Sequence, residues 1–252
     1  MIPNLFHFCY GLSRDFGGKP FSLVHYLAVK SAKEVNKPEE IFFYYSYEPE
    51  GEWWDRTKEL VSLKKIAAPA EIFGNPLYHV AHKADIIRLQ YLIETGGIYM
   101  DLDTISKKPF TPLLKNKFVI GKQGKWRNMG LCNAVMMSEK NSEFAKIWFE
   151  EYRTFRSKGK DKYWAEHSVS VPLKLSKKFP SLLHIEKYNS FHFPLYYSLS
   201  LKDLFVNSKD YPQAYCHHLW EGGSWDLYLR DLTVDQILRI DTTYNIIARR
   251  FL

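Results

Sequence analysis

The pattern of hydrophobic and polar positions predicts alternating strands and helices over the first hundred residues. Three short runs are dense in apolar and aromatic side chains, as buried strands are: residues 2–10, 41–47 and 98–101. Three segments carry apolar side chains three and four residues apart, as amphipathic helices do: residues 21–36, 53–63 and 80–95. Gly96 and Gly97 follow the last helix and suit its C-cap. This alternation predicts an α/β fold with a mainly parallel central sheet.

The second half of the chain has a less regular pattern. It predicts two more strands and two more helices: strands over 118–120 and 131–137, helices over 142–155 and 168–179. Residues 182–215 are irregular, with short extended pieces expected around Phe191 and Ala214. The last residues carry an amphipathic stripe, which predicts a terminal helix docked on the core. No linker divides the chain.

Composition and charge narrow the class of protein. The 252 residues are 46% hydrophobic and 16% aromatic, which is enough for a sizeable core. The net charge of +7 fits nucleic acid, an anionic membrane surface or a phosphate-bearing substrate as partner. We find no helix-turn-helix, zinc-finger or RNP-like motif, so we expect no nucleic-acid partner.

The cysteines and the N-terminus bear on the compartment. Cys9, Cys132 and Cys216 form no CxxC pair, and three cysteines cannot all pair internally, so a reduced cytoplasmic protein is expected. The N-terminus has no signal-peptide pattern, and no apolar stretch reaches about 18 residues. Peripheral contact with the inner membrane face, through an interfacial C-terminal helix, is an open alternative.

Asp101-Leu102-Asp103 is the most informative motif. It places two carboxylates one residue apart at the end of a predicted strand. Mg²⁺ and Mn²⁺ bind such oxygen ligands and commonly share them with substrate phosphates. Ligands of open α/β sheets gather at this end of the strands. We therefore expect a metal–diphosphate site, with Asp103 as direct ligand and Asp101 acting through the ribose or a water.

Two further clusters lie near this motif or late in the chain. Asp85 and Arg88 share a helix face, where an exposed ion pair is the alternative to a sugar and diphosphate contact. Beside the D-x-D motif we favour the contact. The run CHHLWEGGSW, from residue 216 to 225, predicts a loop that folds over a bound metal diphosphate. His218 would complete the metal ligands, Ser224 would donate to a phosphate, and a tryptophan would stack. A surface loop with buried tryptophans is the alternative.

Three stretches of the chain carry a family resemblance. The run HKADIIRLQYLIETGGIYMDLDT, residues 82–104, resembles the D-x-D sugar-binding region of glycosyltransferase family 32. The opening IPNLFH resembles the first strand of that family, and residues 218–225 are similar to its late H-x-W…S-W element. Asn133 resembles a mid-chain asparagine near the donor sugar, and Tyr10 stands where the family has a tryptophan near the base. A more distant likeness is to the glucosylating domains of large clostridial toxins.

The resemblance implies a GT-A fold, a nucleotide-diphospho-sugar donor, Mn²⁺ or Mg²⁺, and retention of anomeric configuration. It also implies the roles of three sets of residues. The catalytic set is Asp85, Arg88, Asp101 and Asp103. The donor-binding set is His7, Tyr10, Asp85, Arg88, Tyr99, Asp101, Asn133, Ser224 and Trp225. The metal-binding set is Asp103, His218 and Asp101.

We therefore expect a single GT-A domain over residues 1–252. Residues 1–137 would form the nucleotide-sugar-binding core, residues 138–230 the acceptor side and closing loop, and residues 231–252 a C-terminal helix. The enzyme would transfer a hexose from a UDP-sugar, or less favoured a GDP-sugar, to a glycan or lipid-linked glycan in surface polysaccharide or glycoconjugate synthesis. The alternatives are a sugar-nucleotide or glycan-binding protein without turnover and a nucleotide-sugar phosphohydrolase.

Retention of configuration leaves two mechanisms open. A double displacement needs a carboxylate under the anomeric carbon, and Asp85, Glu166 and Asp226 are the candidates. Front-face attack by the acceptor, beside the leaving diphosphate, needs none, and we favour it.

Overall fold

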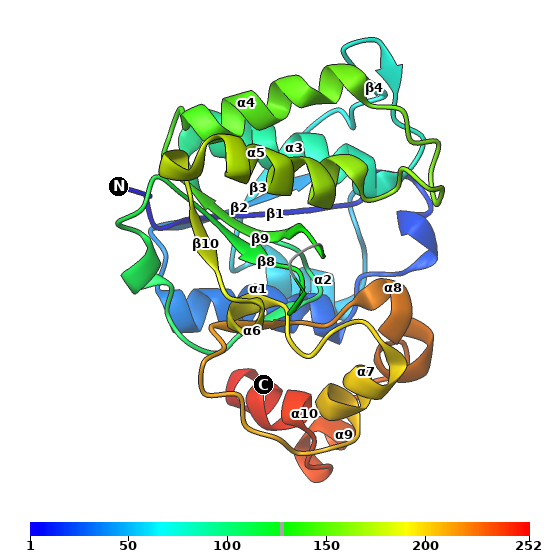
Figure 1. The fold of residues 1–252 in the computed structure, drawn as a ribbon. Helices are drawn as coiled ribbons and strands as arrows, with labels where there is room; N and C mark the ends of the chain where they lie inside the picture. The colour runs from blue at the N-terminus through cyan, green and yellow to red at the C-terminus, as the bar shows by residue number, and fades with distance from the viewer. Residues whose placement is uncertain (127–128) are drawn as a thin grey trace.

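A seven-stranded mixed sheet forms the centre of the molecule in a computed structural model, which describes residues 1–126 and 129–252 (Figure 1). The strand order is β10-β8-β9-β6-β1-β2-β3. The strands are β1 (Leu5–Tyr10), β2 (Glu40–Tyr45), β3 (Ser62–Lys65), β6 (Gly97–Met100), β8 (Phe118–Lys122), β9 (Leu131–Ser138) and β10 (His184–Glu186). Strands β3, β2, β1 and β6 are parallel, whereas β9 is antiparallel to both of its neighbours. The predicted α/β fold class is confirmed.

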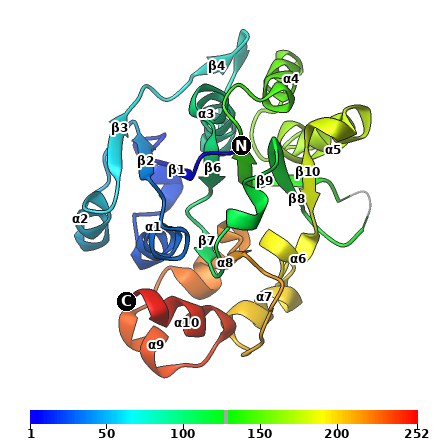
Figure 2. The ribbon, with the colours of Figure 1, turned by 90° about the vertical axis from the view of Figure 1, so that its left-hand side faces the viewer.

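Helices cover both faces of this sheet (Figure 2). One face carries α3 (Val80–Thr95), α4 (Glu143–Glu151) and α5 (Val171–Lys178). The other carries α1 (Leu23–Asn36) and α2 (Glu52–Lys58). Beyond α1 lie the short helices α6 (Tyr188–Phe191), α7 (Ser198–Phe205), α8 (Glu221–Ser224), α9 (Val234–Arg239) and α10 (Thr243–Ala248). Two small sheets, β4 (Glu71–Ile72) with β5 (Asn75–Pro76) and β7 (Thr104–Ser106) with β11 (Cys216–His218), complete the fold.

The two faces hold separate hydrophobic cores, because side chains alternate along each strand. In β6, Ile98 and Met100 enter the core under α1, while Tyr99 enters the core under α3. Asp101, the next alternate residue after Tyr99, therefore also faces α3 and pairs with Arg88. The alternation of side chains thus places the first acid of the D-x-D motif next to α3.

The glycine pair joins α3 to β6 without a loop. Gly96 is the C-cap of α3, with a φ of 71°, and its N–H donates to Leu92 O, as predicted. Gly97 has a φ of 112°, and a Cβ there would lie 2.6 Å from Leu5 O and 2.7 Å from His7 Nε2. Only glycine combines this backbone angle with such a close approach to β1. The pair therefore sets where the strand that leads to Asp101 begins.

Three expectations about local structure are wrong. The helix predicted over 53–63 ends at Lys58, and residues 62–65 instead form β3, which pairs with β2 at the sheet edge. Phe191, expected in an extended piece, ends helix α6. The single C-terminal helix is two short ones, because residues 240–242 break it and Thr242 caps α10 by accepting from Asn245 N. No helix in the described ranges combines the length and apolar character needed to cross a bilayer.

Buried histidines predict a loss of stability in acid. His7 is buried, its Nε2 lies 2.8 Å from Gly96 O, and burial lowers its pKa from 6.5 to about 4. The unfolded chain therefore binds a proton that the folded chain refuses, so the free energy of unfolding should fall as pH drops from about 6.5 to about 4. Denaturant titrations over this range should give a slope for His7→Gln that is smaller by about 1.4 kcal/mol per pH unit than that of the wild type. Identical slopes would refute the assignment.

Candidate active site

The D-x-D motif follows directly after β6, at the carboxyl end of the parallel strands. Asp101 N–H donates to Ala134 O at 2.8 Å, and Thr104 Oγ1 donates to Asp101 O at 2.7 Å. Leu102, between the two acids, is buried in the core under α1. The apolar middle residue thus anchors the turn, and the two carboxylates remain at its surface, 26% exposed for Asp101 and 13% for Asp103.

Arg88 of α3 holds the first acid of the motif. Its Nη2 lies 3.1 Å from Asp101 Oδ1, its Nη1 donates to Asn133 O at 2.8 Å, and its guanidinium lies 4.4 Å from the centre of the Tyr99 ring. Tyr99 Oη also donates to Asp101 Oδ1, at 2.9 Å. Burial raises the pKa of Asp101, and Arg88 only partly offsets this. Asp101 is therefore fixed in orientation by two neighbours.

Asp85 lies one helical turn before Arg88 and is buried with it. Asn133 Nδ2 donates to Asp85 Oδ1 at 2.7 Å, and Arg88 Nε lies 3.6 Å from the same oxygen. Burial raises the pKa of Asp85 against the pull of Arg88 and Asn133. The exposed ion pair considered from the sequence is thus excluded, because both side chains are less than 8% exposed. The predicted grouping of Asp85, Arg88, Asn133, Tyr99 and Asp101 exists in the fold.

His218 reaches the second acid through strand pairing. Strand β11 runs antiparallel to β7 with His218 opposite Thr104, which places its ring beside Asp103. His218 Nε2 lies 3.2 Å from Asp103 Oδ2. Burial opposes charge on both groups, but their mutual attraction lowers the pKa of Asp103 well below its usual range and raises the pKa of His218.

The donor set fits a hard divalent cation. Ligand atoms of Asp101, Asp103 and His218 all lie within 4.8 Å of one another. Two carboxylates and an imidazole match the preference of Mn²⁺ for oxygen and nitrogen ligands. These are the three residues predicted to bind the metal, and the fold brings them together from two strand ends far apart in the sequence.

Glu221 closes the far side of the motif. Its N–H donates to Asp103 Oδ2 at 2.7 Å, and its carboxylate accepts from Lys19 Nζ at 2.8 Å and lies 2.8 Å from His25 Nε2. Burial would raise the pKa of Glu221, but the hydrogen bond to His25 and the nearby charges lower it. The Trp225 ring stacks on the His25 ring, with 5.9 Å between their centres. The segment around Glu221 therefore packs against α1 next to Asp103.

Most of these groups line one cleft of about 360 Å³, within the usual size of small-molecule sites: Lys19, His25, Arg88, Tyr99, Asp101, Asp103 and Glu221. Its floor is the D-x-D motif with Arg88 and Tyr99. The end of β1 and the segment after it, with residues 9–13, 16, 17 and 19, form one wall, which includes Tyr10. Burial raises the pKa of the lining Cys9 thiol to about 11, which keeps the thiol neutral.

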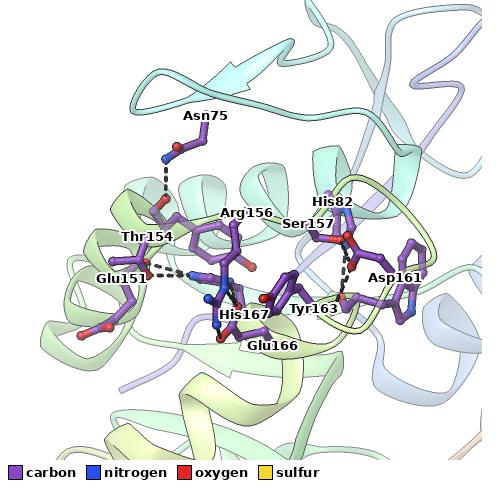
Figure 3. A network of polar contacts seen from close by, with 12 residues as sticks. Asn75, His82, Glu151, Thr154, Arg156, Ser157, Asp161, Tyr163, Glu166 and His167 are labelled. Atoms are coloured by element: carbon purple, nitrogen blue, oxygen red, sulfur yellow. Dashed lines mark hydrogen bonds and ion pairs between the residues drawn. The ribbon is translucent and has the colours of Figure 1, made fainter.

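Residues 152–170, between α4 and α5, form a further part of the wall and carry a polar network of their own (Figure 3). Arg156 donates to both carboxylate oxygens of Glu166, at 2.9 and 2.6 Å, and a turn around Asp161 closes the loop. This network holds Lys160 and Trp164 at the cleft. The segment between α4 and α5 is therefore part of the cleft wall.

Not every predicted donor contact lies in the cleft. His7 is fully buried away from it, with Nδ1 at Tyr44 Oη and Nε2 at Gly96 O. Ser224 Oγ donates to Leu219 O at 2.6 Å and is buried. Trp225 is buried against His25. The same holds for Asp85, Asn133 and His218, which do not line the cleft either, so the contacts of these six residues with a donor or a metal stay predictions.

Several cleft residues had no role in the sequence-based prediction. They are Lys19, His25, His79, Lys160, Trp164 and Glu221. Glu221 stood in the late cluster without an assigned role, whereas the others gave no signal along the chain. Among the candidate nucleophiles, Glu166 pairs with Arg156 and Asp226 pairs with Arg230 outside the cleft.

The fold is that of the GT-A glycosyltransferases. The apo form of mouse xyloside xylosyltransferase 1 matches with a TM-score of 0.53 at 11% identity, over 88% of this chain and 99% of that one. The apo form of the glycosyltransferase GlyE from Streptococcus pneumoniae TIGR4 also gives 0.53 at 11% identity, over 99% of this chain and 60% of that one. At 11% identity these similarities show a shared fold only.

Sequence comparison defines the family. The profile described as "Glycosyltransferase sugar-binding region containing DXD motif" matches residues 22–119. Glucan organizing enzyme 1 of Cryptococcus neoformans var. grubii is 32% identical over 265 residues, which cover 100% of this chain and 71% of the relative. The chain belongs to this family of DXD-containing glycosyltransferases.

Proposed function

We propose that this glycosyltransferase is metal-dependent and retaining, and that it moves a hexose from a nucleotide-diphospho-sugar to a glycan hydroxyl. A UDP-sugar is the favoured donor, with a GDP-sugar as the second choice. The observation that carries the proposal is the convergence of Asp101, Asp103 and His218 within 4.8 Å, next to a cleft that both acids line together with Lys19 and Arg88. A metal-binding cluster beside Lys19 and Arg88 suits an anionic diphosphate better than a neutral glycan alone.

Asp101, Asp103 and His218 would hold the divalent cation, Mn²⁺ or Mg²⁺. When bound, such a cation supplies Lewis-acid stabilisation of a leaving diphosphate. Arg88 keeps Asp101 in place through two contacts and so prepares the site before the donor arrives. Lys19, now paired with Glu221, is the cation in the cleft that can exchange a carboxylate for a phosphate.

The remaining cleft groups would position the donor. Tyr10 and the backbone after β1 lie where the base would sit along the first wall. Asp85 and Asn133 form a polar pair behind Arg88, where a small shift of either side chain would offer a hydrogen bond to the sugar. In this role the Asp85 carboxylate accepts hydrogen bonds from sugar hydroxyl groups, since an ionised carboxylate is an acceptor only.

Retention by front-face attack agrees with the placement of the acids. Within the described residues, Asp85, Glu166 and Asp226 do not line the cleft. In this mechanism the acceptor oxygen bonds to the anomeric carbon as the bond to the diphosphate breaks, and the leaving phosphate takes the acceptor proton. Slow-substrate trapping followed by mass spectrometry checks this, and a covalent glycosyl-enzyme adduct would overturn it.

The acceptor is proposed to be a glycan or lipid-linked glycan. Trp164 and His79 meet edge to face at 4.7 Å on the cleft wall and offer an apolar surface of the kind that sugar rings stack on. The name of the fungal relative connects that protein with glucan, which favours a polysaccharide product for this chain too. Surface polysaccharide or glycoconjugate synthesis is the corresponding process.

Thermal-shift measurements test the donor class. We expect one nucleotide, UDP or GDP, to raise the melting midpoint in the presence of Mn²⁺ and to do so much less with a chelator, since ligands that bind only the folded state stabilise it. Asp103→Asn should lose the metal-dependent part of the shift. If no nucleotide or nucleotide sugar changes the midpoint of the wild type, the proposal fails.

A further inference from the structure

A second cluster of metal-ligating side chains lies directly behind the D-x-D site. Cys132 of β9, His192 after α6 and His218 of β11 bring one ligand atom each to within 4.8 Å of one another. All three residues are buried, with exposures of 6%, 0% and 7%. A thiol and two imidazoles form a softer donor set than the acids of the outer site.

Three imidazole nitrogens of this cluster have no hydrogen-bond partner among the described residues. Neither Nδ1 nor Nε2 of His192 has a hydrogen bond among the residues the structure describes, and the same holds for His218 Nδ1. A buried imidazole without any partner loses its hydration and gains nothing in return, so such groups are rare. A metal cation, which accepts lone pairs from imidazole nitrogens and sulfur, would satisfy these atoms.

The backbone provides the room for this cluster. Gly121 pairs with Cys132 across the antiparallel strands β8 and β9, next to a register shift between Ile120 and Gly121. Side chains of directly opposed residues share a face of the sheet. A Cβ at Gly121 would lie 2.8 Å from His192 Nε2, so the glycine leaves the space that His192 occupies beside the thiol.

We propose that Cys132, His192 and His218 form a second cation site, for Zn²⁺ or a similar borderline-soft divalent ion. Three protein ligands with a fourth position for water are common for zinc bound by cysteine and histidine. Tetrahedral zinc would bring the ligand atoms to about 3.4 Å from one another, which needs small side-chain movements only. Binding displaces the thiol proton to solvent.

His218 belongs to both sites, and this gives the proposal a consequence. Its Nε2 faces Asp103, which leaves Nδ1 for the inner cation. A metal-bound histidine typically donates its other N–H to a carboxylate, and Asp103 Oδ2 is in place to accept it at 3.2 Å. With the inner site filled and no cation in the outer site, His218 is a hydrogen-bond donor to Asp103 through Nε2.

Cobalt substitution tests the inner site directly. The full chain is stripped with a chelator under reducing conditions and titrated with Co²⁺, whose thiolate complexes have a charge-transfer absorption that carboxylate sites lack. We expect this band to saturate at one equivalent in the wild type and in Asp101→Asn. Cys132→Ser should abolish the band. Cys216→Ser is the matched control, since its thiol contacts Phe191 O and lies outside the cluster, and it should retain the band.

Two further variants keep the test sharp if Cys132→Ser folds poorly. His192→Gln should lower Co²⁺ affinity at least about 100-fold, and Gly121→Ala should lower it by displacing the ring without removing a ligand. Zn²⁺ should raise the melting midpoint of the wild type and of Cys216→Ser more than that of His192→Gln, which keeps only the outer site. A wild type without the band, or a band that survives Cys132→Ser, would overturn the proposal. These readouts need no donor, so this site and the transferase proposal can fail separately.

Discussion

Asp103→Asn is expected to lower turnover of the nucleotide-sugar donor about 10³-fold or more, equivalent to roughly 4 kcal/mol of transition-state stabilisation. The substitution keeps the shape of the side chain and an oxygen that can still accept from Glu221 N–H. It removes the negative charge that pairs with His218 and that a divalent cation needs as ligand. Steady-state kinetics at several Mn²⁺ concentrations would show a loss of kcat and a weaker response to the metal.

The control for this variant is Asp235→Asn. Asp235 lies on α9, is 63% exposed and pairs with Arg239, far from the cleft residues. It should leave kcat, metal response and melting midpoint unchanged. If Asp103→Asn turned over donor at the wild-type rate while remaining folded, the D-x-D motif would have no part in the reaction.

The part of the site formed by Asp85, Arg88 and Asp101 was predictable, because it depends on spacing between residues that are close in the sequence. Asp85 and Arg88 are three residues apart on a helix whose bounds follow from its apolar pattern and the glycines after it. The strand after those glycines is short, so Asp101 had to lie near the same helix. Periodicity and a C-cap signal thus fix the relation between helix and motif before any long-range contact is known.

The part of the site formed by Lys19, His25, His218 and Glu221 depends on pairing between distant segments. Glu221 meets His25 across 196 residues and Lys19 across 202, and nothing near any of them in the sequence indicates the other. His218 was predicted as a metal ligand from the cluster at residues 216–225, but its approach to Asp103 depends on the register of β11 against β7. A shift of one residue would turn His217 toward the acid instead, because side chains alternate.

The same alternation explains where His7 departs from expectation. His7 and Tyr10 are three residues apart on β1, so their side chains lie on opposite faces of the strand. Tyr10 reaches the cleft, whereas His7 stacks on Phe42 and contacts the end of α3. A resemblance in the opening strand therefore located the strand correctly without showing which of its side chains meets a ligand.

The misassigned helix over 53–63 has an equally physical cause. Its last residues, with Leu60, Val61 and Leu63, fit a helix stripe and a strand equally well over so short a run. The edge of β2 decides between them, since Ser62 to Lys65 complete its parallel pairing. The hydrogen bonds available at that edge are a property of the assembled sheet, which a local pattern does not contain.

Arg88→Leu is expected to destabilise the fold by about 3–5 kcal/mol, the range for removing one partner of a buried ion pair. Arg88 is 4% exposed and satisfies Asp101, Asp85 and the Asn133 carbonyl at once. Leucine fills part of the volume but leaves the buried carboxylate of Asp85 and the partly exposed carboxylate of Asp101 without their cation. Urea unfolding followed by tryptophan fluorescence would measure the loss.

The pH dependence of that loss identifies its origin. Burial already raises the pKa of Asp85 and Asp101, and without Arg88 both should rise further above their unfolded values. A carboxyl with a raised pKa in the folded state gains stability as pH falls, so the gap between variant and wild type should narrow from pH 7 to pH 5. Asp85→Asn in the Arg88→Leu background should recover part of the loss at pH 7. Arg56→Leu, a control at a 55% exposed ion pair, should cost less than about 1 kcal/mol. An Arg88→Leu protein as stable as this control would show that the buried carboxylates are satisfied by other groups.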